Sequence, residues 1–168
     1  MRQVWITKKG GPEVLEVRES ADLSPQEGEV RVNVKACGIN FADILARKGL
    51  YPDAPKLPAV VGYEISGEID DVGHGVDSQL IGQAVVATTR FGGYSDQVVI
   101  KAHQYFPKPN SLGFEEAVAI PVNYLTAYQL IVAMGNLQPE EAVLIHNAGG
   151  GVGLAALDIA VHIGAKTY

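Results

Sequence analysis

The residues with the clearest chemical potential form the turn Asn147-Ala148-Gly149-Gly150-Gly151-Val152-Gly153. An apolar run precedes this turn, and an apolar helical pattern follows it. Glycine lets a backbone come close to a phosphate and lets a helix touch a strand. The first N–H groups of that helix are unpaired and favour negative charge. The turn therefore predicts dinucleotide binding rather than a plain strand-to-helix turn. It is a variant of the motif, because Ala148 replaces the first glycine of G-x-G-x-x-G. The expected phosphate contacts are Gly150, Gly151, Val152 and Gly153.

Other catalytic chemistries find little support in the sequence. The four histidines are scattered, with no i, i+4 pair, so no metal cluster is expected. No G-x-S-x-G motif is present, which argues against a hydrolase. The single cysteine, Cys37, excludes an intrachain disulfide, and its place in an alternating run predicts plain packing. His146, just before the glycine turn, is expected to pack beneath that loop.

The first 110 residues carry the pattern of short strands punctuated by glycine and proline. Residues 29–36 alternate valine or alanine with polar residues, the period of a strand with one buried face. An all-β barrel or sandwich is expected. One helix is predicted over residues 40–49, ended by Gly49. The other predicted strands are residues 2–7, 14–19, 64–72, 83–89 and 95–101.

The pattern changes to α/β after residue 112. Gly113 can cap one helix, and Pro121 can open a second helix that runs to Gly135. A strand over 142–146, a nearly apolar helix from Val152 and a new strand from Ala165 then give the order of a βαβ unit. We therefore predict a β-rich domain, 1–112, followed by linking helices and the start of a Rossmann dinucleotide-binding domain, 113–168.

Composition narrows the class of protein. The chain has 168 residues, of which 47% are hydrophobic, enough for one domain and a fraction. With 13 basic and 19 acidic residues and no basic run, a nucleic-acid partner is not expected. The N-terminus lacks the apolar run of a secretory signal. Polar residues and Pro121 interrupt the apolar stretch 117–134, which predicts a buried helix rather than a membrane span, in a cytoplasmic protein.

Three longer motifs carry a family resemblance: KACGINFADILARKGLYP, PAVVGYEISGEID and HNAGGGVGLAALDIA. In this order and spacing, the chain resembles the medium-chain dehydrogenase/reductase superfamily, in its zinc-independent quinone oxidoreductase branch. The phrases NYLTAY and GNLQPEE are similar to those of the synaptic vesicle membrane protein homologues in that branch. The resemblance implies a GroES-like barrel, then a nucleotide-binding domain, with the active site in the cleft between them. It covers roughly the first half of such a protein.

The resemblance also implies that the catalytic zinc of other members is lost. Where those members have a cysteine and a G-H-E triplet, this sequence has Gly38-Ile39-Asn40 and Gly62-Tyr63-Glu64. An amide and a phenol replace the thiolate and imidazole that zinc prefers, and Glu64 alone cannot hold the metal. The expected site has no metal.

The family motifs imply roles for five side chains, each with a structural alternative. Asn40 would hydrogen-bond near the nicotinamide or substrate, or cap the following helix. Asp43 and Tyr51 would line the cleft. The structural alternative for Asp43 is a solvated charge in the first turn of the helix, and for Tyr51 it is a turn residue packed before Pro52. Tyr63 would donate to a substrate carbonyl, or fill the space left by the metal. Thr126 would lie close to the cofactor, or bond back to its own helix.

The function implied is NADPH-dependent hydride transfer from the nicotinamide to a quinone or conjugated enone, because activated acceptors need no Lewis acid. The alternative is a non-catalytic nucleotide-binding or regulatory module of the same fold. The residue that reads the ribose should lie just beyond Tyr168, so the sequence is expected to be a truncated part of a longer protein. Relatives suggest a homodimer.

Overall fold

A computed structural model describes residues 1–168 and divides them into two compact units, Met1–Val118 and Ala119–Tyr168. Each unit has a sheet and an apolar core of its own. The short helix α2, Phe114–Ala117, belongs to the first unit. The Ser66 hydroxyl donates to the Phe114 carbonyl oxygen at 2.7 Å, and Ala117 is fully buried. Gly113 is the N-cap of α2, as predicted.

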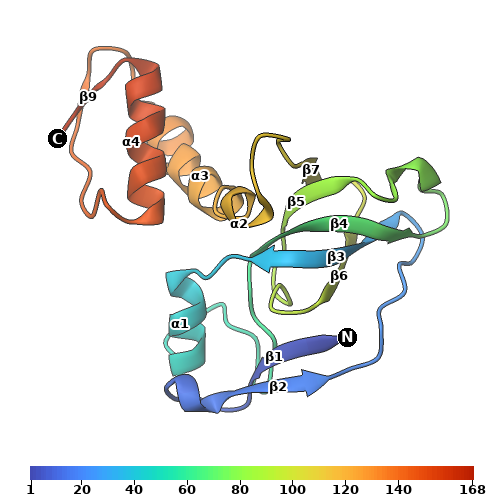
Figure 1. Ribbon diagram of the computed structural model, residues 1–168. Helices are drawn as coiled ribbons and strands as arrows, with labels where there is room; N and C mark the ends of the chain where they lie inside the picture. The colour runs from blue at the N-terminus through green and yellow to red at the C-terminus, as the bar shows by residue number, and fades with distance from the viewer. The chain divides into compact units, whose positions relative to one another are not determined.

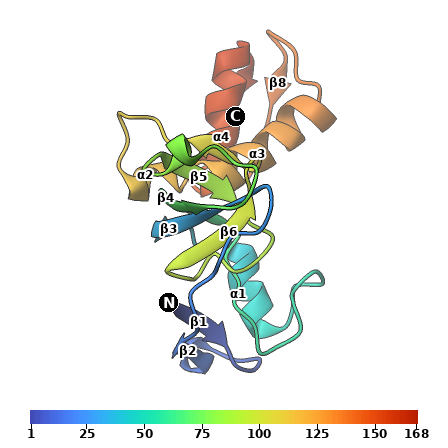
Figure 2. The same cartoon turned by 90° about the vertical axis from the view of Figure 1, so that its right-hand side faces the viewer.

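The first unit is β-rich, as the sequence predicts. Five strands form an antiparallel sheet in the order β6-β3-β4-β5-β7, and β1 and β2 form a separate antiparallel hairpin (Figures 1 and 2). Strand β7 was not predicted, because its three residues end in proline and show no alternation of apolar and polar side chains. The strands are β1 Arg2–Ile6, β2 Leu15–Glu19, β3 Glu29–Cys37, β4 Glu64–Val72, β5 Ala84–Thr88, β6 Gln97–Lys101 and β7 Tyr105–Pro107, and two 3-10 turns are η1 Pro12–Val14 and η2 Ser78–Leu80.

The alternation of β3 explains how the sheet acquires its core. Val30 and Val32 are fully buried, while Arg31 between them reaches the Asp70 carboxylate at 2.8 Å. The predicted strand is therefore confirmed, with one face apolar and the other polar. Ile65 and Ile69 of β4 and Val85 and Ala87 of β5 join the same apolar cluster.

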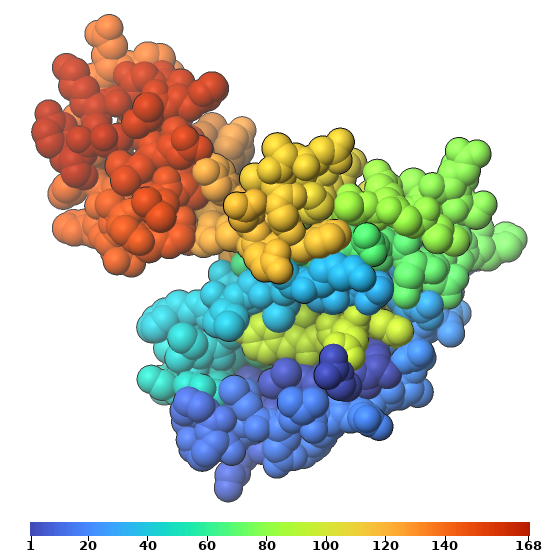
Figure 3. Space-filling view, viewed as in Figure 1, coloured from blue at the N-terminus to red at the C-terminus, as the bar shows by residue number.

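A second apolar cluster in the first unit holds the hairpin and helix α1, Phe41–Lys48. Residues 94–96 join the hairpin to the five-stranded sheet. The carbonyl oxygen of Tyr94 accepts from the Val4 N–H, and that of Asp96 accepts from the Val34 N–H, both at 2.9 Å. Figure 3 shows this yellow-green segment between the dark blue hairpin and the light blue β3. The cluster consists of Ile6, Val14, Ala46 and Val61.

The second unit has the βαβ order that the sequence predicts. Strands β8, Ala142–Val143, and β9, Lys166–Thr167, pair in parallel, and helix α4, Gly151–Ile163, connects them. β8 is shorter than the predicted run 142–146, although the Ile145 N–H still donates to the Tyr168 carbonyl oxygen at 2.9 Å. Helix α3, Pro121–Tyr128, begins at its proline and continues as the π-helix η3, Gln129–Met134.

Helices α3 and α4 pack side by side through small residues (Figure 1). The prediction of a buried helix over 117–134 is wrong for this chain, since only 28% of the most apolar window of Phe114–Met134 is buried. By length and composition alone, that helix could cross a membrane. This is weak evidence of a membrane span, because the core helices of soluble proteins pass the same test. The uncovered apolar side chains of this unit include Leu125, Tyr128, Leu130, Met134, Leu154 and Val161.

Candidate active site

Helix α1 starts at a tightly bonded turn that places Asn40. Asn40 is the N-cap, in extended conformation, as one of its two predicted roles requires. Its backbone N–H donates to Oδ2 of Asp43 at 2.8 Å, and the Asp43 N–H donates to the Asn40 carbonyl oxygen at 3.0 Å. A carboxylate three residues into a helix satisfies an N–H group that the helix cannot, which stabilises the start of α1.

Asp43 is buried, with only 4% of its surface exposed. Its second oxygen, Oδ1, accepts from the Gly62 N–H at 3.1 Å. The alternative of a solvated helix charge is therefore wrong, because both oxygens hold backbone groups inside the protein. Burial raises the pKa of Asp43 above its usual range, and hydrogen bonds from the Asn40 N–H, the Tyr94 hydroxyl and the Gly62 N–H only partly offset that effect. Asp43 thus ties the start of α1 to the turn before β4.

The side chain of Asn40 is held by a second buried carboxylate. Its Nδ2 donates to Oε1 of Glu64 at 2.8 Å, and Glu64 is 2% exposed. Sequence reasoning considered Glu64 only as a metal ligand and missed this partnership. The closeness of the two segments is visible only in the structure, where a Cβ added to Gly38 would lie 2.6 Å from the Glu64 carboxyl carbon. Only glycine leaves room for the carboxylate there.

Tyr63 packs among aromatic rings at the start of β4. Its ring lies edge-on to Tyr51, with centroids 6.3 Å apart, and tilted against Phe91 at 5.6 Å. The hydroxyl oxygen is buried and has no hydrogen-bond partner. Burial, with smaller contributions from Tyr51 and Asp43, raises the pKa of Tyr63. The side chain is therefore a neutral phenol, which fills the space as one alternative predicts and keeps an unused O–H donor.

The turn that carries Tyr63 is fixed on both sides. Gly62 has φ +104°, a conformation that suits glycine. The hydroxyl of Thr89 donates to the Gly62 carbonyl oxygen at 2.7 Å, and the Thr89 N–H donates to the Tyr63 carbonyl oxygen at the same distance. Asn40, Asp43, Tyr63 and Glu64 are thus brought together by bonds between the two predicted motifs. We call these four residues the Asn40 cluster.

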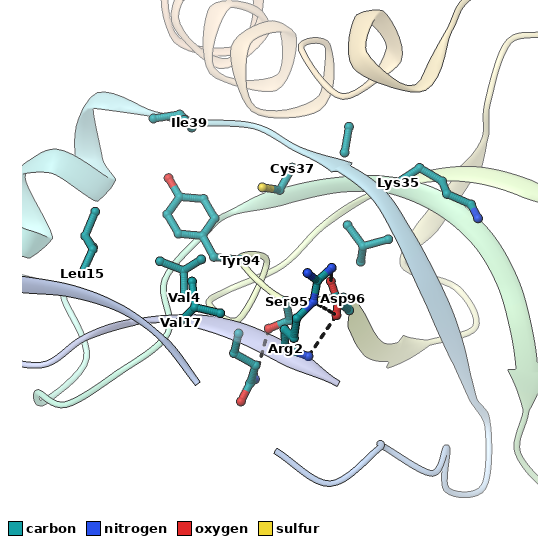
Figure 4. A pocket seen from close by; sticks show the side chains of 13 residues that line it. Arg2, Val4, Leu15, Val17, Lys35, Cys37, Ile39, Tyr94, Ser95 and Asp96 are labelled. Carbon is teal, nitrogen blue, oxygen red and sulfur yellow. Dashed lines mark hydrogen bonds and ion pairs between the residues drawn. The ribbon is translucent and has the colours of Figure 1, made fainter. Parts of the chain in front are cut away.

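Tyr94 adds a second buried hydroxyl near the Asn40 cluster, and no sequence pattern singled it out. Burial raises the pKa of Tyr94, with further contributions from the charge of Asp43 and from a hydrogen bond to its carboxyl group. The ring borders a pocket of about 490 Å³ between the hairpin and β3, with Val4 and Val17 opposite (Figure 4). Cys37 lines the same pocket and is exposed, so the prediction that it simply packs is wrong.

The glycine turn in the second unit is built from backbone. Gly150 is the N-cap of α4, and its N–H donates to the Asn147 carbonyl oxygen at 3.0 Å. Asn147 itself has φ +56°. A Cβ on Gly153 would clash with the Asn147 carbonyl oxygen and lie 2.8 Å from the Ala148 Cα. The close approach predicted for Gly153 is present, between the helix and the turn.

The start of α4 leaves backbone N–H groups available for a ligand. The first N–H groups of a helix have no partner inside it, and at this helix they belong to Gly151, Val152 and Gly153. Gly151 is exposed. Thr126 is exposed on α3, within the same unit.

His146 is exposed rather than packed beneath the loop, so that prediction is wrong. No three histidine, cysteine or acidic residues lie close enough to hold a metal.

Comparison with known proteins identifies the family. The alcohol dehydrogenase GroES-like domain matches residues 26–127. The chain belongs to this family. The predicted membership of the medium-chain dehydrogenase/reductase superfamily is confirmed, in the branch that holds quinone oxidoreductases and the VAT-1 homologues. The matched residues overlap most of the predicted β-rich part and extend into α3.

Relatives match nearly the whole chain. The human synaptic vesicle membrane protein VAT-1 homolog is 42% identical over 161 residues, which are 95% of this chain and 41% of the relative. The quinone oxidoreductase of Salmonella typhimurium is 41% identical over 165 residues, 98% of this chain and 50% of the relative. The chain therefore spans half the length, or less, of these two curated relatives.

Solved structures match equally broadly. The crystal structure of the human synaptic vesicle membrane protein VAT-1 homolog-like protein has a TM-score of 0.94 and 34% identity, and covers 99% of this chain and 54% of that one. The Escherichia coli quinone oxidoreductase complexed with NADPH has a TM-score of 0.90 and 39% identity, with coverages of 99% and 51%.

Proposed function

We propose that this chain is part of an NADPH-dependent, zinc-independent oxidoreductase that transfers hydride to a quinone or conjugated enone. The observation that carries the proposal is the glycine turn, where Gly153 allows α4 to start against the backbone of the turn. We interpret β8, α4 and β9 as the first βαβ unit of a Rossmann domain. Relatives named quinone oxidoreductase, one of them solved with NADPH, support the assignment.

The residues of the second unit fit a dinucleotide. The N–H groups of Gly151, Val152 and Gly153 would hold the pyrophosphate, with Gly150 allowing the close approach. Thr126 is the further contact proposed from the family motif. When bound, NADPH supplies the hydride at its nicotinamide ring, and the protein supplies orientation and charge stabilisation.

The Asn40 cluster supplies the polar groups for the acceptor. Asn40 would hydrogen-bond to the ligand, while Tyr63 and Tyr51 would donate to the acceptor oxygen as negative charge develops on it. Tyr63 suits this role because its buried hydroxyl has no partner in the protein and its raised pKa keeps it protonated. The resemblance implies that Asp43 lines the cleft. We propose instead that it holds the backbone, since both of its oxygens already accept from backbone N–H groups.

The amide of Asn40 and the phenol of Tyr63 support a mechanism without zinc. Neither is a ligand that zinc prefers. Acceptors that already stabilise negative charge, such as quinones and conjugated enones, suit such a site better than simple alcohols. We include in the proposal a homodimer of the whole protein, from the family resemblance, and a cytoplasmic location, from the sequence pattern.

The test is NADPH oxidation with a small quinone, in the presence and absence of a chelator. We expect turnover from a longer polypeptide that contains this chain, unchanged by the chelator, and weak turnover from the 168 residues, which span half the relatives' length or less. The variant Asn40→Ala should lower kcat/KM by roughly tenfold, the worth of one hydrogen bond in a buried site. Nucleotide binding without oxidation across a panel of quinones and enones would favour the non-catalytic module. Chelator-sensitive alcohol oxidation would instead support a zinc enzyme.

A further inference from the structure

The amide of Asn40 has a defined orientation. An asparagine side chain presents a donor at Nδ2 and an acceptor at Oδ1, and can turn either one toward a ligand. Here Nδ2 donates to Oε1 of Glu64 at 2.8 Å. Because this hydrogen bond uses the nitrogen end of the amide, Oδ1 lies on the other side of the side chain, away from Glu64.

Glu64 is itself confined to one position. It is the first residue of β4, where it pairs with Thr88 of β5, and it is 2% exposed. The Gly38 N–H donates to the Glu64 carbonyl oxygen at 3.2 Å. An added Cβ on Gly38 would lie 2.5 Å from the Glu64 Cγ. The carboxylate therefore occupies space that exists only because residue 38 is glycine.

The backbone of Asn40 is held separately from its side chain. Oδ2 of Asp43 accepts from the Asn40 N–H at 2.8 Å, while Oδ1 of Asp43 accepts from the Gly62 N–H at 3.1 Å. Asp43 thus fixes where residue 40 lies, and Glu64 fixes which end of its amide is presented. The two buried carboxylates perform different tasks.

We propose that Glu64 is a positioning residue, which holds Asn40 so that Oδ1 is offered as a hydrogen-bond acceptor to an N–H or O–H group of the ligand. This inference rests on the proposed function, and deepens it, because it states the polarity of the Asn40 contact. A ligand that offers only acceptors to Asn40 would meet the wrong end of the amide.

The principal variant is Glu64→Gln, which keeps the shape of the side chain at residue 64 and removes its preference for one end of the Asn40 amide. A glutamine amide can donate to Oδ1 of Asn40 or accept from Nδ2, so both orientations of Asn40 become possible. The matched control is Glu68→Gln on the same strand, because that side chain is 45% exposed and only 3.3 Å from Lys35. A second variant, Gly38→Ala, displaces the Glu64 carboxylate without changing its charge, and Gly113→Ala is its control, since a Cβ there meets nothing closer than 3.5 Å.

The first readout is the side-chain amide of Asn40 in NMR spectra of the 168-residue chain, which needs no activity. We expect the Asn40 Nδ2 proton that faces Glu64 to shift in Glu64→Gln and Gly38→Ala, and to stay unchanged in the two controls. Unchanged Asn40 signals in both variants would overturn the proposal, whether or not the protein turns over.

The second readout is kcat/KM for NADPH and quinone, measured in the longer polypeptide. Glu64→Gln should lose roughly tenfold, the worth of one oriented hydrogen bond. In an Asn40→Ala background the same change should have almost no further effect, because coupled residues are non-additive. An equal loss in both backgrounds would show a general structural role and overturn the proposal. Absence of turnover in the parent protein would contradict the proposed function, while the NMR result would still decide the role of Glu64.

Discussion

The Asn40 cluster and the glycine turn are built from different kinds of polar group. In the cluster, two buried carboxyl groups hold two backbone N–H groups and the amide of Asn40, and the Tyr63 hydroxyl has no hydrogen-bond partner. In the turn, the groups on offer are backbone N–H, and the important side chains are the ones that glycine lacks. A site of side chains depends on particular residue types, whereas a site of backbone depends on the absence of a Cβ.

The largest expected effect is at the backbone site. Gly153→Ala places a methyl group against the Asn147 carbonyl oxygen and the Ala148 Cα, neither of which can rotate away. We expect a loss of about 3 kcal/mol in the stability of the second unit, at the upper end of overpacking costs, and loss of NADPH binding. Thermal unfolding measures the loss of stability, and a titration with NADPH measures the loss of binding.

The control for this change is Gly149→Ala, because nothing lies within 4 Å of a Cβ there. That variant should unfold like the parent chain. Equal stability of Gly153→Ala and Gly149→Ala would contradict the close approach of α4 to the turn.

An intermediate effect is expected from Asp43→Asn in the side-chain site. The new amide can accept from only one of the two N–H groups that Asp43 holds, which costs about 1–3 kcal/mol. The cost should depend on pH. Burial raises the pKa of Asp43 from 3.8, so the folded protein keeps this proton to a higher pH than the unfolded chain. The stability that this group contributes is present below 3.8 and is lost as pH rises through the raised pKa.

The measurement is the free energy of unfolding of both proteins across that range. The difference between the parent chain and Asp43→Asn should be largest at low pH and shrink as pH rises. A difference that grows with pH would mean that the native state favours the charged carboxylate.

The smallest effect is expected at Asn147. Its φ of +56° suits glycine as well as asparagine, and its carbonyl oxygen makes the bond to Gly150 whatever the side chain. Asn147→Gly should change stability by less than about 0.5 kcal/mol and leave nucleotide affinity within twofold, whereas Asn147→Ala should cost about 1 kcal/mol. A tenfold loss of NADPH affinity in Asn147→Gly would show that the side chain contributes to binding.

Local pattern was enough to predict most of the architecture. Alternation located β3, and the capping residues Asn40, Gly49 and Gly113 located two helices, because these signals lie within a few neighbouring residues. The three-residue β7 was missed, since its place is decided by pairing with β5.

Burial and partners were harder to predict because they depend on distant segments. Asp43 looks like an exposed helix charge until Gly62, nineteen residues on, supplies its second hydrogen bond. Glu64 was considered only as a zinc ligand that cannot hold the metal alone, and its contacts with Asn40 and Gly38 depend on a segment more than twenty residues away. Cys37 and His146 are exposed, although the sequence around each residue predicted packing.

The most direct test of the account follows backbone amide signals of Gly150, Gly151, Val152 and Gly153 during a titration of the isotope-labelled chain with NADPH. We predict saturable shifts at these four amides that disappear in Gly153→Ala, with the side-chain amide of Asn40 followed in the same spectra. Shifts elsewhere in the chain, with those four amides unchanged at saturating nucleotide, would contradict the proposed dinucleotide site.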